Sequence, residues 1–328
     1  REGDLVAWNA MRNYVESNNP SLSAVYQEIE RRLDLVNFVD YLLPLVYADT
    51  DDWPHNNWRA ARERVPGGRF RFYVWDAEWS FGYNNTPSHN TLSGQLSSFS
   101  PPWGTTEIQR LYVKLRSSPE FRLLFADRIH KHFYNDGALT DARIRNRYNQ
   151  LKAAVAGTIS GFNDAIGTTW IPQRRRYLTN HFASAGLLAS SNAPVFNQFG
   201  GRVAEGFALT MSAPAGTVYY TTNGVDPRVP FTGAVAAPAR GFVPGNPLVL
   251  HQGTWIKART LAGTNWSALS EAVFAVAEIG VPLRITEIMY HPVGGEGYEY
   301  VELENVSSVP VDLSGMSFEG VEYRFSEG

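Results

Sequence analysis

The chain has 328 residues, carries 29 Lys and Arg against 32 Asp and Glu, and contains no cysteine. Its hydrophobic share of 44% and charged share of 19% are typical of globular proteins, so they exclude a disordered chain and a collagen-like fibre. No run of about 18 apolar residues predicts a membrane span, and the missing cysteine excludes a disulfide scaffold, a thiolate metal site and a cysteine nucleophile.

Helical periodicity dominates the first part of the chain. Apolar residues at three- and four-residue spacing predict three helices, over 4–18, 23–32 and 35–47, and Asp34 can cap the third of them. A polar loop over 49–57 follows. Alternating basic and aromatic residues over 69–75 then predict a strand.

A long loop rich in Ser, Asn, Gly and Pro covers 82–104, and a loop of this length inside a domain is usually functional or mobile. Beyond it we expect further helices at 105–117, 119–134, 140–159 and 172–184. The last of these carries the run Arg174-Arg175-Arg176, which we expect to form a solvated helix face.

From Ala193 the periodicity changes to two. Short alternating segments and turn dipeptides predict about six strands up to residue 276, at the spacing of a β-sandwich. A second β unit starts at Leu283 and offers too few strands to close a core alone. We therefore predict a multidomain α+β protein, with a mainly helical domain at 1–190, a β-sandwich at 191–278 and a partial β-sandwich at 279–328.

The charge distribution changes at the same boundary. Residues 1–190 carry a small excess of basic side chains, and 191–328 carry an excess of acidic ones. Neither part is basic enough to predict a nucleic-acid partner. Only four of the 29 cations are lysines, and the first of them is Lys114.

Two acidic segments form the densest polar cluster in the sequence. Asp52 and Asn57, in the loop 49–57, have the D-x4-N spacing in which a kinase Asp accepts the proton of the attacking hydroxyl and the Asn holds Mg²⁺. Asp76 stands at a strand end before Phe81-Gly82, as the metal-chelating carboxylate of a kinase does. Asp76 with Asn57, and Glu78 in addition, supplies the oxygen ligands that Mg²⁺ requires. By spacing alone, solvated acidic loops explain these residues as well.

The segments 37–41, 52–57, 69–72 and 75–82, taken in this order, closely resemble the spore coat protein H (CotH) kinase family. Residues 118–122 and 173–176 match the style of that family, so the resemblance covers about 1–190. The family consists of atypical, secreted or spore-associated protein kinases that use ATP and a divalent metal.

The resemblance implies a role for each residue of the two acidic segments. Asp52 is the implied catalytic base, and Asn57 and Asp76 are implied metal ligands for Mg²⁺. His55 lies inside the implied catalytic loop, where it would contact the ATP phosphates or the substrate. Glu78 stands where the family usually has a second Asp, as a third implied metal ligand. Thr50 replaces the Asn often found two residues before the catalytic Asp.

The second part of the chain resembles two other modules. Residues 209–228 and 256–259 resemble the chitobiase/β-hexosaminidase C-terminal domain, an immunoglobulin-like sandwich without the catalytic site of those enzymes. Residues 285–292, 299–305 and 312–315 resemble the opening of a lamin tail domain. This order of modules is similar to that of large bacterial secreted or cell-surface proteins. It implies an extracellular or cell-surface location, and a protein substrate or surface-layer or other extracellular partners.

Two elements of a kinase are missing upstream of Asp52. A kinase needs a cation on the α- and β-phosphates and a loop that covers them, but no Lys and no G-x-G-x-x-G precedes Asp52. Either the nucleotide-gripping part lies outside this chain, which is then a fragment of a longer one, or the chain is a degenerate relative without activity. We favour the fragment, and we expect the chain alone to be inactive.

Three hypotheses about function follow. The chain is a portion of a kinase that transfers the γ-phosphate of ATP to Ser or Thr with Mg²⁺, or it is a structural or adhesive surface protein whose kinase-like domain is only a scaffold. Carbohydrate binding through the aromatic side chains of Tyr219 or Trp266 is the third.

Overall fold

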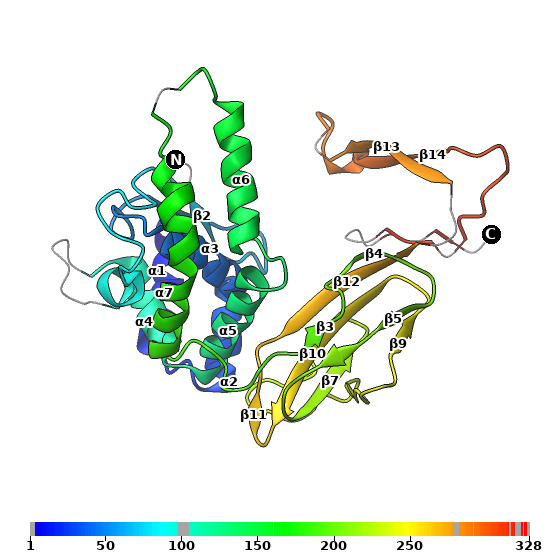
Figure 1. Ribbon diagram of the computed structural model, residues 1–328, viewed down its shortest axis with the longest axis horizontal. Coiled ribbons are helices and arrows are strands. Elements are labelled where there is room, and N and C mark those ends of the chain that lie inside the picture. Colours follow the sequence, from blue (N-terminus) through cyan, green and yellow to red (C-terminus); the bar gives the residue numbers. More distant parts are fainter. Residues whose placement is uncertain are drawn as a thin grey trace.

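The computed structural model describes residues 4–97, 105–159, 161–277, 282–290, 292–314, 316–318, 323 and 325–326. Over these residues the protein is a mixed α+β structure, in which helices fill the first part of the chain and strands the second (Figure 1). His291 and Gly315, which belong to the lamin-tail resemblance, and the last residues of the predicted loop 82–104 lie outside the described residues.

Three helices and a hairpin open the chain: α1 (Val6–Ser17), α2 (Ser23–Arg32), α3 (Leu35–Ala48), β1 (Trp58–Ala61) and β2 (Arg71–Val74). They are followed by α4 (Glu107–Arg116), α5 (Pro119–Phe133), α6 (Asp141–Ala154) and α7 (Ile171–Ser184), with short π-helical turns at Leu92–Leu96 and Ile166–Trp170. The predicted helices are confirmed, although α6 ends at Ala154 and not at residue 159. Strand β1 is an addition that the sequence did not predict.

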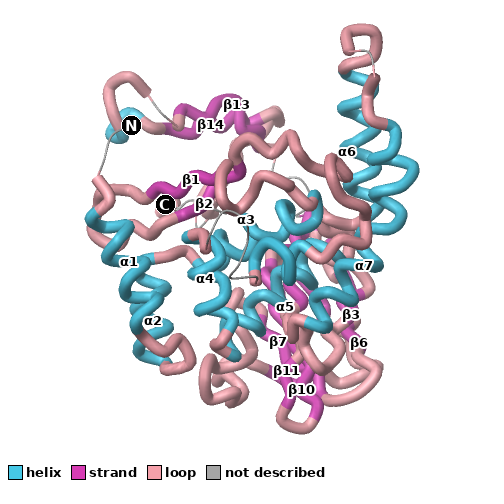
Figure 2. Tube along the Cα trace, turned by 90° about the vertical axis from the view of Figure 1, so that its left-hand side faces the viewer, coloured by secondary structure: helices cyan, strands magenta, loops and turns pink. Residues whose placement is uncertain are grey.

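Helix α3 forms the centre of the helical part. Ten of its residues are buried, and it contacts β2, α5 and α7 (Figure 2). The Asp34 carboxylate accepts the backbone N–H of Asn37 at 3.1 Å, so the predicted N-cap is confirmed. Because α3 is buried on nearly every side, its C-terminal end is a fixed point from which the next loop departs.

The strands of the second part surround a separate hydrophobic core. Its largest sheet has the order β4-β12-β10-β7-β8, with β11 paired to β10 and a parallel β4–β12 pair. These strands are β4 (Gly201–Ala204), β7 (Thr217–Thr221), β8 (Arg240–Gly241), β10 (Thr254–Ala262), β11 (Asn265–Trp266) and β12 (Ser270–Ala277).

Three two-stranded ladders accompany that sheet. They pair β3 (Val195–Phe196) with β6 (Met211–Ser212), β5 (Phe207–Leu209) with β9 (Leu248–Leu250), and β13 (Leu283–Met289) with β14 (Tyr300–Asn305). A single 3-10 turn, Glu296–Tyr298, lies between β13 and β14. The side chains of β13 and β14 are largely exposed, so this hairpin adds little to the core.

Helix α5 joins the helical part to the strands. The Arg259 guanidinium of β10, with a side chain 3% exposed, lies between the carboxylates of Asp127 and Asp226 at 2.6 to 2.8 Å. Glu120 accepts two hydrogen bonds from Arg228, at 2.8 and 2.6 Å. The two cores are therefore held together by buried and half-buried ion pairs along one helix.

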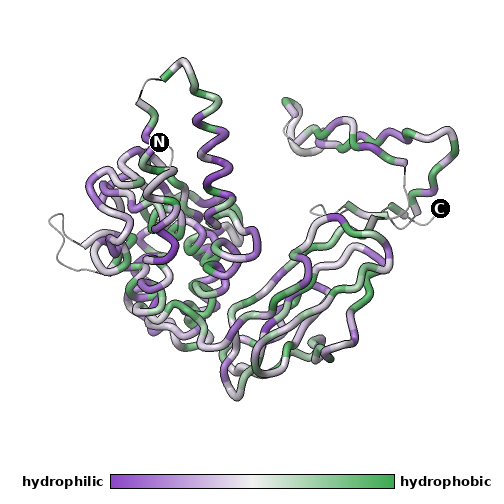
Figure 3. Tube along the Cα trace, viewed as in Figure 1, coloured by the Kyte–Doolittle hydropathy of each residue, from purple (hydrophilic) through white to green (hydrophobic). Residues whose placement is uncertain are grey.

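Helix α6 is the least buried helix of the described chain. None of its residues is buried, and its trace is mostly hydrophilic (Figure 3). Over the described residues, no helix combines the length and the apolar character needed to cross a bilayer.

Candidate functional site

The β1–β2 hairpin brings the two acidic segments to one place. Asn57 directly precedes β1, and Asp76 follows β2 after a single residue, while Trp58 pairs with Val74 in the ladder. Both Asn57 and Asp76 have left-handed backbones, with φ of 54° and 52°. Asn and Asp tolerate this conformation better than most residues, so each strand can turn sharply at the same end of the hairpin.

Backbone hydrogen bonds fasten the two loops to each other. The N–H of Asp51 donates to the carbonyl of Trp79 at 2.8 Å, and the N–H of Phe81 donates to the carbonyl of Ala48 at 2.7 Å. The hydroxyls of Thr50 and Ser80 lie 2.8 Å apart. The acidic loops therefore form one hydrogen-bonded unit at the end of α3.

Within this unit, Asp52 and Asn57 are in direct contact. The Asn57 amide donates from Nδ2 to Asp52 Oδ2. Asp52 Oδ1 is buried and has no hydrogen-bond partner among the described residues. A buried carboxylate oxygen is costly to leave unpaired, and a hydroxyl, a metal ion or a water bound at this atom would relieve that cost.

Asp76 and Glu78 complete the acidic group, and both are exposed. A hydrogen bond from its own backbone acts to lower the pKa of Glu78. The adjacent Asp76 carboxyl, with the negative charges of Asp76 and Asp52, outweighs that bond and raises the pKa above its ordinary value. Three of the predicted site residues therefore interact electrostatically. His55 lies half-buried on the same loop as Asp52 and Asn57.

The donor set suits a hard cation in part. Within the described ranges, no three His, Cys, Asp or Glu side chains are grouped to enclose a metal ion by themselves. Mg²⁺ commonly takes only one or two carboxylates and completes its shell with water and phosphate oxygens. The amide oxygen of Asn57 and the carboxylate of Asp76 fit that chemistry, and Glu78 offers a further carboxylate beside Asp76.

Sequence reasoning missed a buried polar group directly beneath the acidic loops. Asp49, at the C-terminal end of α3, has a fully buried side chain that accepts hydrogen bonds from Thr91 Oγ1 at 2.6 Å and His89 Nδ1 at 2.9 Å. Arg174 of α7 is also fully buried. The prediction of a solvated face is thus wrong for Arg174, although Arg176 is exposed.

Arg174 is buried because backbone carbonyls surround it. Its guanidinium donates to the carbonyls of Tyr47, Val46, Pro87 and His89 and to Thr91 Oγ1, at 2.6 to 3.0 Å. Burial lowers its pKa to about 10, which still leaves it charged at neutral pH. We call Asp49, His89, Thr91 and Arg174 the buried node. It fixes the end of α3 from which the Asp52 loop departs.

The buried node predicts a pH dependence of stability. The hydrogen bond to Asp49 raises the pKa of His89 above its ordinary 6.5, against the opposing effect of partial burial. A histidine with a raised folded-state pKa stabilises the fold fully below pH 6.5, and the contribution is lost as the pH rises through the raised value. Urea unfolding should therefore show the wild type losing stability relative to His89→Gln across this interval. Parallel curves for the two proteins would contradict the ion pair.

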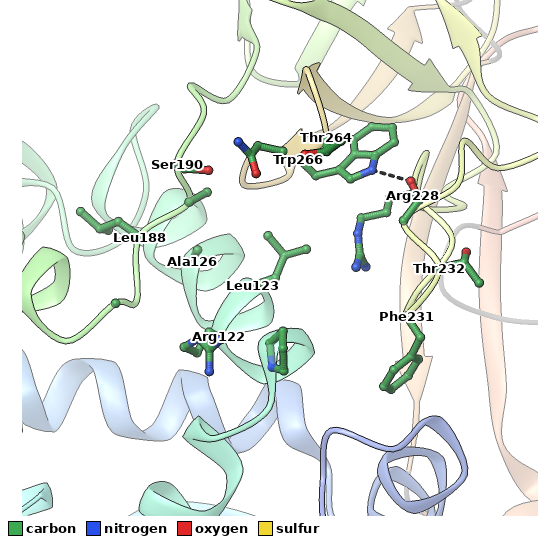
Figure 4. A pocket seen from close by; sticks show the side chains of 15 residues that line it. Arg122, Leu123, Ala126, Leu188, Ser190, Arg228, Phe231, Thr232, Thr264 and Trp266 are labelled. Atoms are coloured by element: carbon green, nitrogen blue, oxygen red, sulfur yellow. Dashed lines mark hydrogen bonds between the residues drawn. The ribbon is translucent and has the colours of Figure 1, made fainter.

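A hollow of about 480 Å³ lies between α5 and the strands, lined by Arg122, Leu123, Phe231 and Trp266 among others (Figure 4). None of the five predicted site residues lines it. Trp266 is only 7% exposed, and its indole N–H donates to the carbonyl of Gly233 at 2.7 Å. The expectation of an exposed aromatic platform at Trp266 is therefore wrong.

Comparison with known protein families gives a match that covers most of the helical part of the chain. The family described as CotH kinase protein matches residues 2–168, just over half of the chain and the part that holds both acidic loops. No curated protein and no solved structure was found to match the chain. The match over this part of the sequence shows that the chain belongs to the CotH kinase protein family.

Proposed function

We propose that this chain carries the acidic catalytic portion of a protein kinase at the bacterial cell surface or outside the cell. It would transfer the γ-phosphate of ATP to a Ser or Thr hydroxyl with Mg²⁺. The observation that carries the proposal is the buried Asp52 Oδ1, which lacks a partner beside Asn57 in a loop hydrogen-bonded to the loop of Asp76. Membership of the CotH kinase family supports it.

Each side chain has a distinct task under this proposal. Bound ATP and Mg²⁺ would supply the phosphoryl group and neutralise its charge. Asp52 Oδ1 would orient the substrate hydroxyl and accept its proton. The Asn57 side chain donates an N–H to Asp52, so its amide oxygen would be available to the metal, and Asp76 would add a carboxylate. Glu78 would lose its proton readily beside a cation, because its raised pKa comes from neighbouring carboxylates. His55 would contact the phosphates or the substrate.

Calorimetry on the full-length protein tests the proposal. We expect ATP to bind only when Mg²⁺ is present, and we expect Asp76→Asn to weaken that binding at least about tenfold. Glu205→Gln, at an exposed position of the strand part, is the matched control and should bind as the wild type does. Absence of metal-dependent heat in the full-length protein would favour the alternative, a structural or adhesive surface protein in which this domain is only a scaffold.

A further inference from the structure

Arginines gather at the far end of the β1–β2 hairpin from the acidic loops. A hollow of about 390 Å³ is lined by Arg62, Arg69 and Arg71 together with Tyr73 and the turn glycines. A second hollow of about 730 Å³ shares Arg62 and Arg69 and continues to Arg31 and Arg32 at the end of α2. We call these two adjoining hollows the arginine hollow.

The guanidinium groups of the arginine hollow have N–H donors that are not used by partners within the protein. Asp34 is the shared carboxylate partner of Arg69 and Arg71, but it takes one N–H from each, at 3.5 and 3.1 Å. Their side chains remain 43% and 54% exposed. Arg62 is exposed and makes no ion pair with a carboxylate of the described residues. Each guanidinium has five N–H donors in a planar fork, so most of these donors are available to a ligand.

Acidic side chains neutralise only part of this positive charge. Glu28 is already paired with Arg31 and Arg32, at 2.9 and 2.7 Å. Burial raises the pKa of Glu30; the Arg69 charge opposes this shift and the Glu120 charge adds to it. Glu63 also lines the smaller hollow, so the two hollows together are lined by five arginines and three glutamates. The excess of arginine favours an anionic ligand with planar carboxylate or phosphate groups.

We propose that the arginine hollow binds an acidic segment of a protein partner. A nucleic acid fits less well, because the arginines occupy one short hairpin end and the chain has a net charge of −3. A peptide segment can place several carboxylates against separate guanidinium forks. The binding itself requires neither nucleotide nor phosphoryl transfer.

The hairpin also relates the arginine hollow to the acidic loops. Arg71 and Asp76 are joined by strand β2 and one further residue, which at strand rise separates them by roughly 16 Å. If the proposed kinase function holds, on which this step rests, the partner is the substrate. Its acidic segment then lies about five extended residues from the phosphorylated Ser or Thr.

Fluorescence anisotropy tests the binding directly, without ATP. The probe is a labelled peptide of eight glutamates, and a peptide of eight glutamines is its neutral counterpart. We expect the glutamate peptide to bind and the glutamine peptide not to bind. The affinity for the glutamate peptide should fall as the salt concentration is raised. The double variant Arg31→Gln/Arg62→Gln, at two arginines that line the hollow, should weaken it about tenfold, through the loss of two charge pairs. These two arginines leave the Asp34 cap intact, so folding is preserved.

The double variant Arg202→Gln/Arg240→Gln removes the same charge from exposed positions of the strand part. It should bind the glutamate peptide as the wild type does. Equal weakening by both double variants, or none by Arg31→Gln/Arg62→Gln, would overturn the proposal. Tighter competition by a short single-stranded oligonucleotide than by unlabelled peptide would overturn the class of partner. If the protein binds the glutamate peptide but shows no metal-dependent ATP binding, the proposed peptide-binding surface is supported and the proposed kinase function is refuted.

Discussion

Replacing Asp76 with alanine should lower phosphoryl transfer by at least about 10³-fold, because a metal-holding carboxylate supports several kcal/mol of transition-state stabilisation. Asp76 stands at the end of β2 with a left-handed backbone and interacts with Glu78. Alanine removes the carboxylate without touching the hydrogen bonds that join the two loops. Transfer of radiolabel from [γ-³²P]ATP by the full-length protein measures the effect.

Two companion variants sharpen this experiment. Asp52→Asn should lose turnover and keep Mg²⁺-dependent ATP binding, because Asp52 is proposed to act on the hydroxyl proton. Glu205→Ala changes an exposed acid of the strand part and should leave transfer unchanged. Wild-type transfer by Asp76→Ala would refute the metal assignment, whereas equal loss of ATP binding in both site variants would refute the division of roles.

Replacing Arg259 with methionine should lower the free energy of unfolding by about 3–5 kcal/mol, because it leaves the largely buried carboxylate of Asp127 and the half-buried carboxylate of Asp226 without their cation. Burial acts to raise the pKa of Asp226, but hydrogen bonding and charge from Arg259 bring it below its ordinary value. Asp127 depends on the same guanidinium and on the N–H of Leu269. Urea unfolding at pH 7, followed by tryptophan fluorescence, measures the loss.

The difference in free energy of unfolding between the wild type and Arg259→Met should become smaller as the pH falls towards about 4, where aspartates ordinarily titrate. Without Arg259, burial favours the protonated carboxyls, so the variant gains stability on acidification while the wild type loses the contribution of Asp226. Arg202→Met, at an exposed position, should change stability by less than about 0.5 kcal/mol. A deficit that stays constant between pH 7 and 4 would show that Arg259 acts through packing and not through charge.

Local patterns predicted the helices well. The spacing of buried residues in α3 and the Asp34 cap can be read from a few consecutive residues, and both are present in the structure. The D-x4-N spacing marked Asp52 and Asn57 as a pair of candidate site residues, and the structure adds that the two side chains are in contact. The short strand β1 was missed because Trp58–Ala61 has too few residues to show a clear alternation.

Contacts between distant segments could not be predicted. The run Arg174-Arg175-Arg176 has the composition of a solvated face, yet Arg174 is buried because the carbonyls that surround it come from α3 and from the loop at 87–89. Asp49 seemed no different from Asp51 in the sequence, and only the positions of His89 and Thr91 distinguish them. The arginines on both sides of the Pro66-Gly67-Gly68 turn can be read from the sequence. The hollow that they line cannot, because it depends on how the turn packs against the end of α2.

The buried node has a consequence for the order in which the protein forms. Arg174 donates to carbonyls of Val46 and Tyr47, which precede it by 128 and 127 residues. During synthesis the Asp52 loop therefore leaves the ribosome long before Arg174, whose side chain holds the end of α3 from which that loop departs. Because contacts between such distant positions are slow to close, the acidic loops should be among the last parts of the helical half to become ordered. A nascent chain that ends before α7 would carry every residue of the acidic loops and still lack the guanidinium that holds the end of α3 beneath them.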